Sequence, residues 1–178
     1  MPVQIGVKPH NFQEPLGLLS DCHRRIEMFL GILEALGKSL DRPPSAESRR
    51  ALETALLYFR EAAPKHTADE EESLFPRLRG MQSGNLEKAL AKMDELSGDH
   101  RRAEALHEEL DHLGCTYLSR GKLNPDELAK FRDDVASLTA MYQRHIKIED
   151  SELFPVAAEV LPEGEKLAIA KEMANRRS

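Results

Sequence analysis

A histidine–glutamate pattern occurs twice in the chain. Each copy has a histidine, a glutamate four residues later and then a Leu-Phe-Pro tripeptide; the pairs are His66–Glu70 and His145–Glu149. On a helix, residues four apart lie on one face, about 6 Å apart along the axis. An imidazole and a carboxylate in this arrangement can bind one metal ion together. A solvated helix face would tolerate a single such pair, but two copies with the same tripeptide favour a metal site.

The repeat extends to two further histidines. His23 and His100 are each followed by an Arg-Arg pair, and each precedes one of the histidine–glutamate copies. The chain therefore reads as two halves, each with one histidine on its first helix and His-x-x-x-Glu on its second.

The elements that must position these residues are helices. Hydrophobic residues make up 40% of the 178 residues, charged residues 31% and aromatic residues 5%, a balance that favours helices in a single domain. Apolar residues recur at three-and-four spacing, which marks one buried face on each helix. The predicted segments are an irregular arm over 1–14, a bundle over 15–160, and a short C-terminal helix and tail over 161–178.

Within the bundle, the sequence predicts helices from Pro15 to about Leu40, from the cap Ser45 to about Leu78, from the cap Asn85 to near Gly121, and from the capping box that starts at Asn124; a last short helix is expected from about Glu165 to Ala174. Pro64 removes an amide hydrogen bond inside the second helix, so we expect a kink just before His66. Pro76 marks a further bend or the end of that helix.

The spacing of the four histidines from the turns places them together. Short connections make successive helices antiparallel, and the histidines lie at similar distances from each turn, within about one helical turn. We therefore predict an all-α, up-down-up-down four-helix bundle with all four histidines in one layer.

The chemistry expected of that layer is metal binding. A buried carboxylate must be paired, protonated or bound to a metal, and two carboxylates with four imidazoles suit two divalent ions. Ligands without thiolate favour iron, manganese or zinc. We predict terminal ligands and two bridging carboxylates, namely His23, His66, His100 and His145 with Glu70 and Glu149. The alternative is a polar core network of histidine–glutamate pairs.

On these six residues and the two Leu-Phe-Pro tripeptides, the sequence resembles the hemerythrin-like family of HHE cation-binding domains, over roughly Pro15 to Val160. The resemblance implies a four-helix bundle that holds a non-haem di-iron centre and handles oxygen, nitric oxide, peroxide or iron.

The chain departs from the oxygen-carrying members at two places. The third helix has His100-x-x-x-Glu104 where those proteins have a second histidine, and Asp150 lies five residues after His145, so it competes with Glu149 as the bridging ligand. The internal repeat favours Glu149. The ligand set is similar to that of proteins that repair iron–sulfur clusters, but the Cys-x-x-Cys segment those proteins carry is absent from this chain.

Several other polar residues lie near the predicted layer. Glu27 and Glu104 each follow a histidine by four and are expected outside the ligand set or on a solvated face. His107 is expected to be a hydrogen-bonded core histidine, and Tyr142 to pack in the core. Cys22 and Cys115 lie too far apart along the bundle to form a disulfide.

Charge and composition exclude some classes of partner. The net charge is −6 and no basic block is longer than the closing Arg176-Arg177 pair, which argues against nucleic acid and anionic membranes. The N-terminus lacks a signal-peptide pattern, so we expect a soluble, cytoplasmic protein. The expected function is a reaction with oxygen, peroxide or nitric oxide in stress defence; the alternative is a non-catalytic protein that binds or senses oxygen or iron.

Overall fold

The computed structural model describes residues 10–81 and 86–178, and within those ranges the chain forms helices and no strand, as predicted. The helices are α1 Pro15–Leu36, α2 Ala46–Glu61, α3 Ala63–Ala68, α4 Phe75–Arg79, α5 Leu86–Arg120, α6 Pro125–Ile148, α7 Phe154–Val160 and α8 Glu163–Asn175, with two π-helical segments, η1 Asp69–Leu74 and η2 Glu149–Leu153.

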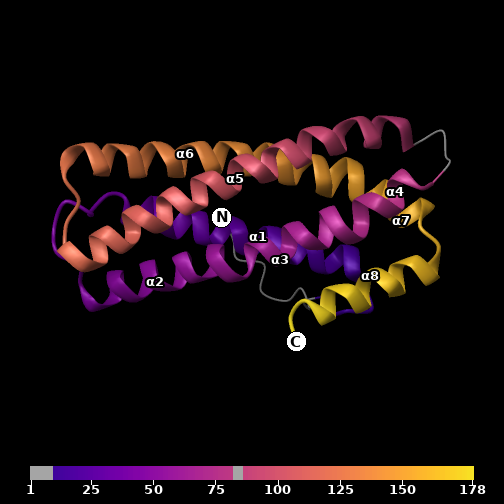
Figure 1. The fold of residues 1–178 in the computed structure, drawn as a ribbon, viewed down its shortest axis with the longest axis horizontal. Coiled ribbons are helices and arrows are strands. Elements are labelled where there is room, and N and C mark those ends of the chain that lie inside the picture. The colour runs from indigo at the N-terminus through magenta and orange to yellow at the C-terminus, as the bar shows by residue number, and fades with distance from the viewer. Residues whose placement is uncertain (1–9, 82–85) are drawn as a thin grey trace, which may run out of the picture.

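The long helices pack around a common axis (Figure 1). Helix α1 packs against α2 and α6, and α5 packs against the same two helices. The backbone amide of Leu123 donates to the carbonyl of Leu40 over 2.8 Å, which joins the connection after α5 to the connection after α1. Those two connections therefore lie at the same end of the bundle. This arrangement is compatible with the alternating helix directions that the sequence predicts.

The buried apolar side chains form two clusters with a polar layer between them. On α1, Leu19 belongs to one cluster and Ile26 to the other, and His23 lies between them in the sequence. On α5, Leu96 and Ala103 flank His100 in the same way. The clusters fix the register of the helices, and that register holds the histidines at one level of the bundle.

Local sequence accounts for the helix starts. Ser45 accepts a hydrogen bond from the amide of Ser48 over 3.0 Å, and Asn124 and Glu127 form a reciprocal capping box, as predicted. The predicted cap Asn85 lies outside the described residues, as does the 1–9 part of the expected N-terminal arm. His10 to Glu14 precede α1 without helical structure.

The prolines interrupt the second helical segment at two places. Helix α2 ends at Glu61 and α3 begins at Ala63, close to the predicted kink, because Pro64 has no amide to donate to the carbonyl of Arg60. Before Pro76 the chain forms the π-helix η1, in which the amide of Phe75 donates to the carbonyl of Glu70, five residues back. The segment η2 repeats this arrangement before Pro155. Sequence analysis predicted a bend or an end at Pro76 and missed the π-helices.

Two predicted boundaries need correction or extension. Helix α1 ends at Leu36, not near Leu40, although Leu40 is fully buried beyond the helix end. The short C-terminal helix is α8, which runs from Glu163 to Asn175, slightly beyond the predicted bounds, and packs against α1 and η1.

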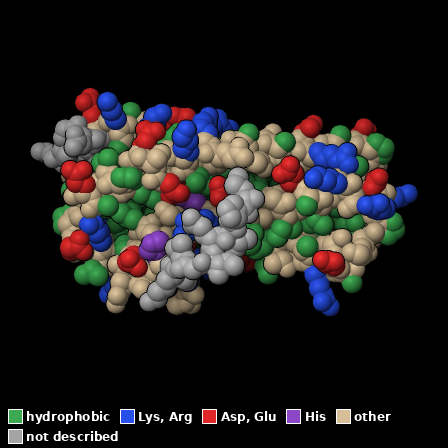
Figure 2. Space-filling view, turned by 180° about the vertical axis from the view of Figure 1, so that it is seen from behind, with side chains coloured by type: hydrophobic (Ala, Val, Ile, Leu, Met, Phe, Trp, Pro, Cys, Tyr) green, Lys and Arg blue, Asp and Glu red, His purple; other side chains and the backbone are tan. Residues whose placement is uncertain are grey.

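Acidic, basic and apolar side chains are interspersed on the face seen in Figure 2. None of the helices in the described ranges combines the length and the apolarity needed to cross a bilayer.

Candidate metal centre

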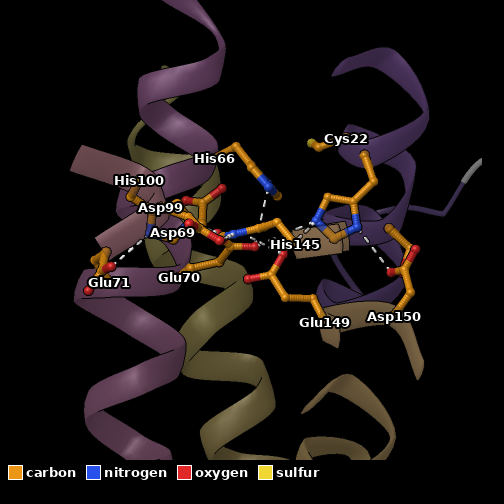
Figure 3. Close-up of polar contacts among 12 residues, drawn as sticks. Cys22, His66, Asp69, Glu70, Glu71, Asp99, His100, His145, Glu149 and Asp150 are labelled. Atoms are coloured by element: carbon orange, nitrogen blue, oxygen red, sulfur yellow. Dashed lines mark hydrogen bonds and ion pairs between the residues drawn. The ribbon is translucent and has the colours of Figure 1, made fainter. Parts of the chain in front are cut away.

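Six predicted donor residues converge at the polar layer (Figure 3). All six are buried, with exposed fractions of 8% or less. They come from six different elements: His23 from α1, His66 from α3, Glu70 from η1, His100 from α5, His145 from α6 and Glu149 from η2. The carboxylates thus sit on the two π-helical segments, a type of helix that often occurs at functional sites.

The first donor group joins both carboxylates to the histidines of the N-terminal half. Nε2 of His23 lies 3.1 Å from Oε2 of Glu149, and Nε2 of His66 lies 3.2 Å from Oε1 of Glu70. His23 also lies 3.8 Å from Oε1 of Glu70. One donor atom from each of these four residues falls within 4.8 Å of every other, a separation that one metal ion could span.

The second donor group contains the same two carboxylates. Nε2 of His100 lies 3.2 Å from Oε2 of Glu70, and Nε2 of His145 lies 3.2 Å from Oε2 of Glu149. These four residues meet the same 4.8 Å limit. Glu70 thus offers one oxygen to each group, which is the geometry required of a bridging carboxylate.

The polar atoms of the layer lack the hydrogen bonds that a closed protein network would provide. Nε2 of His23 and of His100 lie 3.1 and 3.2 Å from carboxylate oxygens, but neither they nor the oxygens of Glu70 and Glu149 meet a partner in hydrogen-bond geometry among the described residues. Leaving a buried polar atom unpaired costs about 1–3 kcal/mol, and more if the group is charged. The donor set therefore fits divalent cations better than it fits a self-contained polar network.

In three of the histidines, a further carboxylate contacts Nδ1, the ring nitrogen that does not face Glu70 or Glu149. Nδ1 of His23 lies 3.0 Å from Asp150, and Nδ1 of His100 lies 2.7 Å from Glu71. Each of these carboxylates directly follows one of the central glutamates in the sequence. Such contacts fix the tautomer and orientation of a metal-binding imidazole and leave Nε2 for the ion.

The Nδ1 atoms of the other two histidines, His145 and His66, have different surroundings. Nδ1 of His145 lies 3.4 Å from Oδ2 of Asp99, which also pairs with Arg144 over 2.6 Å. Nδ1 of His66 is buried and has no hydrogen-bond partner in the described part of the chain. The two halves are therefore similar in their central donors and different around them.

The charges in the layer perturb each other's protonation strongly. Burial favours the uncharged imidazole, but the nearby carboxylates, led by Asp150 and Glu149, raise the pKa of His23 well above its ordinary value. Burial is likewise outweighed at His100, where Glu70 is the first of the carboxylates that raise the pKa to about 10. The imidazoles around Glu70 overcome its burial and hold its pKa well below the usual range. The ionised Glu70 therefore requires positive charge nearby, which metal ions can supply in place of protons.

The remaining candidates lie outside both donor groups. Glu27 and Glu104 are exposed. The His107 ring packs 4.6 Å from the ring of Phe59, and the buried Tyr142 ring lies 6.1 Å from that of His145. Cys22 and Cys115 are both free, in agreement with the expectation that they do not form a disulfide.

Sequence reasoning named Asp150 only as a competitor of Glu149 for the bridging position, and it missed Glu71 and Asp99, the other carboxylates that orient the rings. Glu71 and Asp150 occupy matching positions in the repeat, one residue after each central glutamate, and this coincidence was a usable signal. Asp99 directly precedes His100 but contacts His145, on another helix, so no local pattern could identify its partner.

A second buried acid lies beside Glu70. Asp69 is fully buried, and its two oxygens pair with Arg176 over 3.0 Å and with Arg177 over 2.6 Å. Arg176 also donates to the hydroxyl of Ser73 over 3.0 Å. The C-terminal basic pair, which the sequence marked only as a short charged block, therefore holds the π-helix that carries Glu70. We call this set of contacts the C-terminal clamp.

Comparisons with known proteins identify the family to which most of the chain is similar. Residues 14–157 match the family described as "Hemerythrin HHE cation binding domain". A protein of Haemophilus influenzae, described only as an uncharacterized protein, is 27% identical over 175 residues, which cover 96% of this chain and 96% of that protein. No solved structure matches the chain significantly.

Proposed function

The chain belongs to the hemerythrin HHE cation-binding domain family, and from this premise we propose that it holds two iron ions and uses them to bind or react with oxygen, peroxide or nitric oxide in defence against oxidative or nitrosative stress. The family and the donor clusters support cation binding. The choice of iron, the number of ions and the reaction are our proposal.

The observation that carries the proposal is that two donor groups share Glu70 and Glu149. If two ions are bound, Glu70 and Glu149 would belong to the ligand set of both, with His23 and His66 in one set and His100 and His145 in the other. Each group offers two imidazoles and two carboxylate oxygens, a set without thiolate that suits iron, manganese or zinc. We propose His23, His66, His100 and His145 as the terminal ligands.

A pair of iron ions supplies Lewis acidity and two exchangeable electrons, which suits the chemistry of small oxygen and nitrogen species. The protein's own part is to hold the donors rigidly and to keep bulk water out. Asp150, Glu71 and Asp99 orient His23, His100 and His145 through their Nδ1 atoms. The two apolar clusters above and below the layer restrict access along the bundle axis.

The first experiment is metal analysis. Protein loaded with iron under anaerobic conditions and desalted should retain two ions per chain, as measured by elemental analysis and by its optical spectrum. A folded protein that retains one ion or none would contradict the proposal.

The second experiment separates reaction from binding. The iron-loaded protein is mixed with peroxide or with nitric oxide, and the consumption of each is followed at steady state. Turnover that exceeds one equivalent per chain supports a catalytic role. Iron binding with a spectral change but without turnover would instead support the non-catalytic alternative, a protein that binds or senses its ligand.

A further inference from the structure

A cavity of about 330 Å³ opens beside the polar layer. Its lining comes from α3, η1 and α5 together with Tyr142 of α6, and it includes His100, one of the proposed ligands. We call it the α3–α5 cavity. Because His100 is part of its lining, the cavity reaches one of the proposed ligands.

The volume of this cavity exceeds what a diatomic molecule needs. A water molecule occupies about 30 Å³ in the liquid, so the cavity corresponds to roughly ten waters. Small apolar residues, among them Ala63, Pro64, Ala68 and Ala103, form part of the wall. A wall of this kind can accommodate a short hydrocarbon group.

The charged residues of the cavity do not attract anions. Glu71, Glu72 and Glu104 line it with Arg101, and two of these acids already have a basic partner, Glu71 in His100 and Glu72 in Arg176. The cavity therefore offers no surplus of positive charge to an anionic ligand. The apolar part of its wall also disfavours a ligand that must bring a full charge out of water.

Two of the lining residues, His107 and Tyr142, can make hydrogen bonds to an uncharged ligand. Nε2 of His107 is buried without a hydrogen-bond partner among the described residues, and His107 lines this cavity and a neighbouring one of about 220 Å³. Burial lowers the pKa of His107 to about 4, so its ring is neutral at pH 7 and can both donate and accept a hydrogen bond. The pKa of Tyr142 is raised by burial and, to a smaller extent, by the charges of Tyr58, Glu70 and Glu149, so its hydroxyl stays protonated.

We propose that the α3–α5 cavity binds an uncharged organic molecule with one polar end, of the class of a small alkyl hydroperoxide, and directs it to the His100 side of the metal centre, with Tyr142 and His107 as its polar contacts. This inference rests on the proposed function, because it assumes a metal centre beside His100. It narrows the substrate class from peroxides in general to those with a short apolar group.

The test uses protein loaded with zinc, which is redox-inert, so that binding is measured without turnover. The probe is tert-butyl alcohol, an unreactive analogue of an alkyl hydroperoxide, and acetate serves as an anion of similar size. Binding of each is followed by saturation-transfer NMR. We expect the alcohol to bind more tightly than acetate.

Two matched variants locate the site. Ala68→Leu fills the cavity from α3 and is compatible with a helix; it should weaken binding of the alcohol at least about tenfold. Ala105→Leu makes the same change at an exposed position of α5 that does not line the cavity, and should leave binding unchanged. Tyr142→Phe keeps the ring, removes the hydroxyl and should weaken binding about fivefold, the size expected for one hydrogen bond.

The outcomes distinguish this inference from the proposed function. If wild-type protein fails to retain zinc or iron, the proposed metal centre is wrong. If metal is retained but acetate binds more tightly than the alcohol, the substrate class is wrong. If metal is retained and Ala68→Leu binds the alcohol as well as Ala105→Leu does, the cavity is not the binding site. Circular dichroism and metal content check that each variant is folded.

Discussion

Removal of the C-terminal clamp should destabilise the whole bundle. Asp69 has no exposed surface, and its carboxylate pairs with Arg176 and Arg177, whose side chains are 20% and 28% exposed. The double variant Arg176→Ala/Arg177→Ala leaves this carboxylate buried without either cation. Removing the partner of a buried charge costs about 3–5 kcal/mol. That loss is a large fraction of the roughly 5–15 kcal/mol that separates the folded from the unfolded state of most domains.

The internal repeat supplies a rescue for this variant. In the second half, the residue directly before the central glutamate is Ile148, which is 6% exposed and packs in an apolar cluster. Adding Asp69→Ile to the double variant therefore removes the unpaired buried carboxylate. It also places an isoleucine at the position that Ile148 occupies in the second half. We expect the triple variant to regain most of the lost free energy of unfolding, because well-packed apolar residues often replace a buried ion pair at little cost.

Urea unfolding of metal-free protein, followed by circular dichroism, measures these free energies. Arg79→Ala is the matched control: it removes an exposed ion pair with Asp94 (3.2 Å) and should cost less than about 1 kcal/mol. The reasoning is refuted if the double variant is no less stable than this control. It is also refuted if the triple variant is no more stable than the double variant.

Three further predictions concern the metal layer and its surroundings. Glu149→Ala should lose most bound metal, whereas Asp150→Ala, which removes only the carboxylate beside Nδ1 of His23, should weaken metal affinity by about 10–100-fold in a chelator competition; equal losses would contradict these roles. Chelation should lower the melting temperature by about 10 °C and speed amide hydrogen exchange in α3 and α6, because metal stabilises only the folded state; an unchanged melting temperature would show that no such coupling exists. Burial lowers the pKa of His107 to about 4 from an unfolded value of about 6.5, so the unfolded chain binds an extra proton between these values and stability falls as the pH drops through this window. His107→Leu should therefore show a shallower loss of stability than wild type from pH 6.5 to 4, and parallel curves would exclude the burial of a neutral ring at this position.

The helices and their buried faces could be predicted because both depend on local pattern. Apolar residues recur at three-and-four spacing on α1, for example at Leu19, Cys22 and Ile26, and the structure buries all three. Residue counts from the turns predicted the four histidines in one layer, and their donor atoms do lie together with those of Glu70 and Glu149. That they bind metal ions remains a prediction.

The features that the sequence did not predict depend on contacts between distant segments. In the sequence, Asp69 is one of several acids in an acidic run. It is buried and paired only because α8 brings Arg176 and Arg177, which follow this helix in the chain, next to it. The end of α1 at Leu36 has a similar cause. Leu40 continues the apolar spacing of the helix, but beyond the helix end its carbonyl instead accepts a hydrogen bond from Leu123 in the connection after α5.

The π-helices η1 and η2 let each Glu-to-Pro segment carry one residue more than an α-helix with the same flanking register. In an α-helix each residue turns the chain by about 100°, whereas the wider π turn accommodates one extra residue before the helix resumes. Glu70 faces the metal layer while Leu74 and Phe75 fill the apolar cluster next to it. Deleting one residue between them would return the segment to an ordinary helix and leave Leu74 and Phe75 facing their cluster, because the π turn had absorbed that residue. Related chains should therefore lose one residue here, at the exposed Glu72, more readily than they lose Glu71 or Ser73, which contact His100 and Arg176.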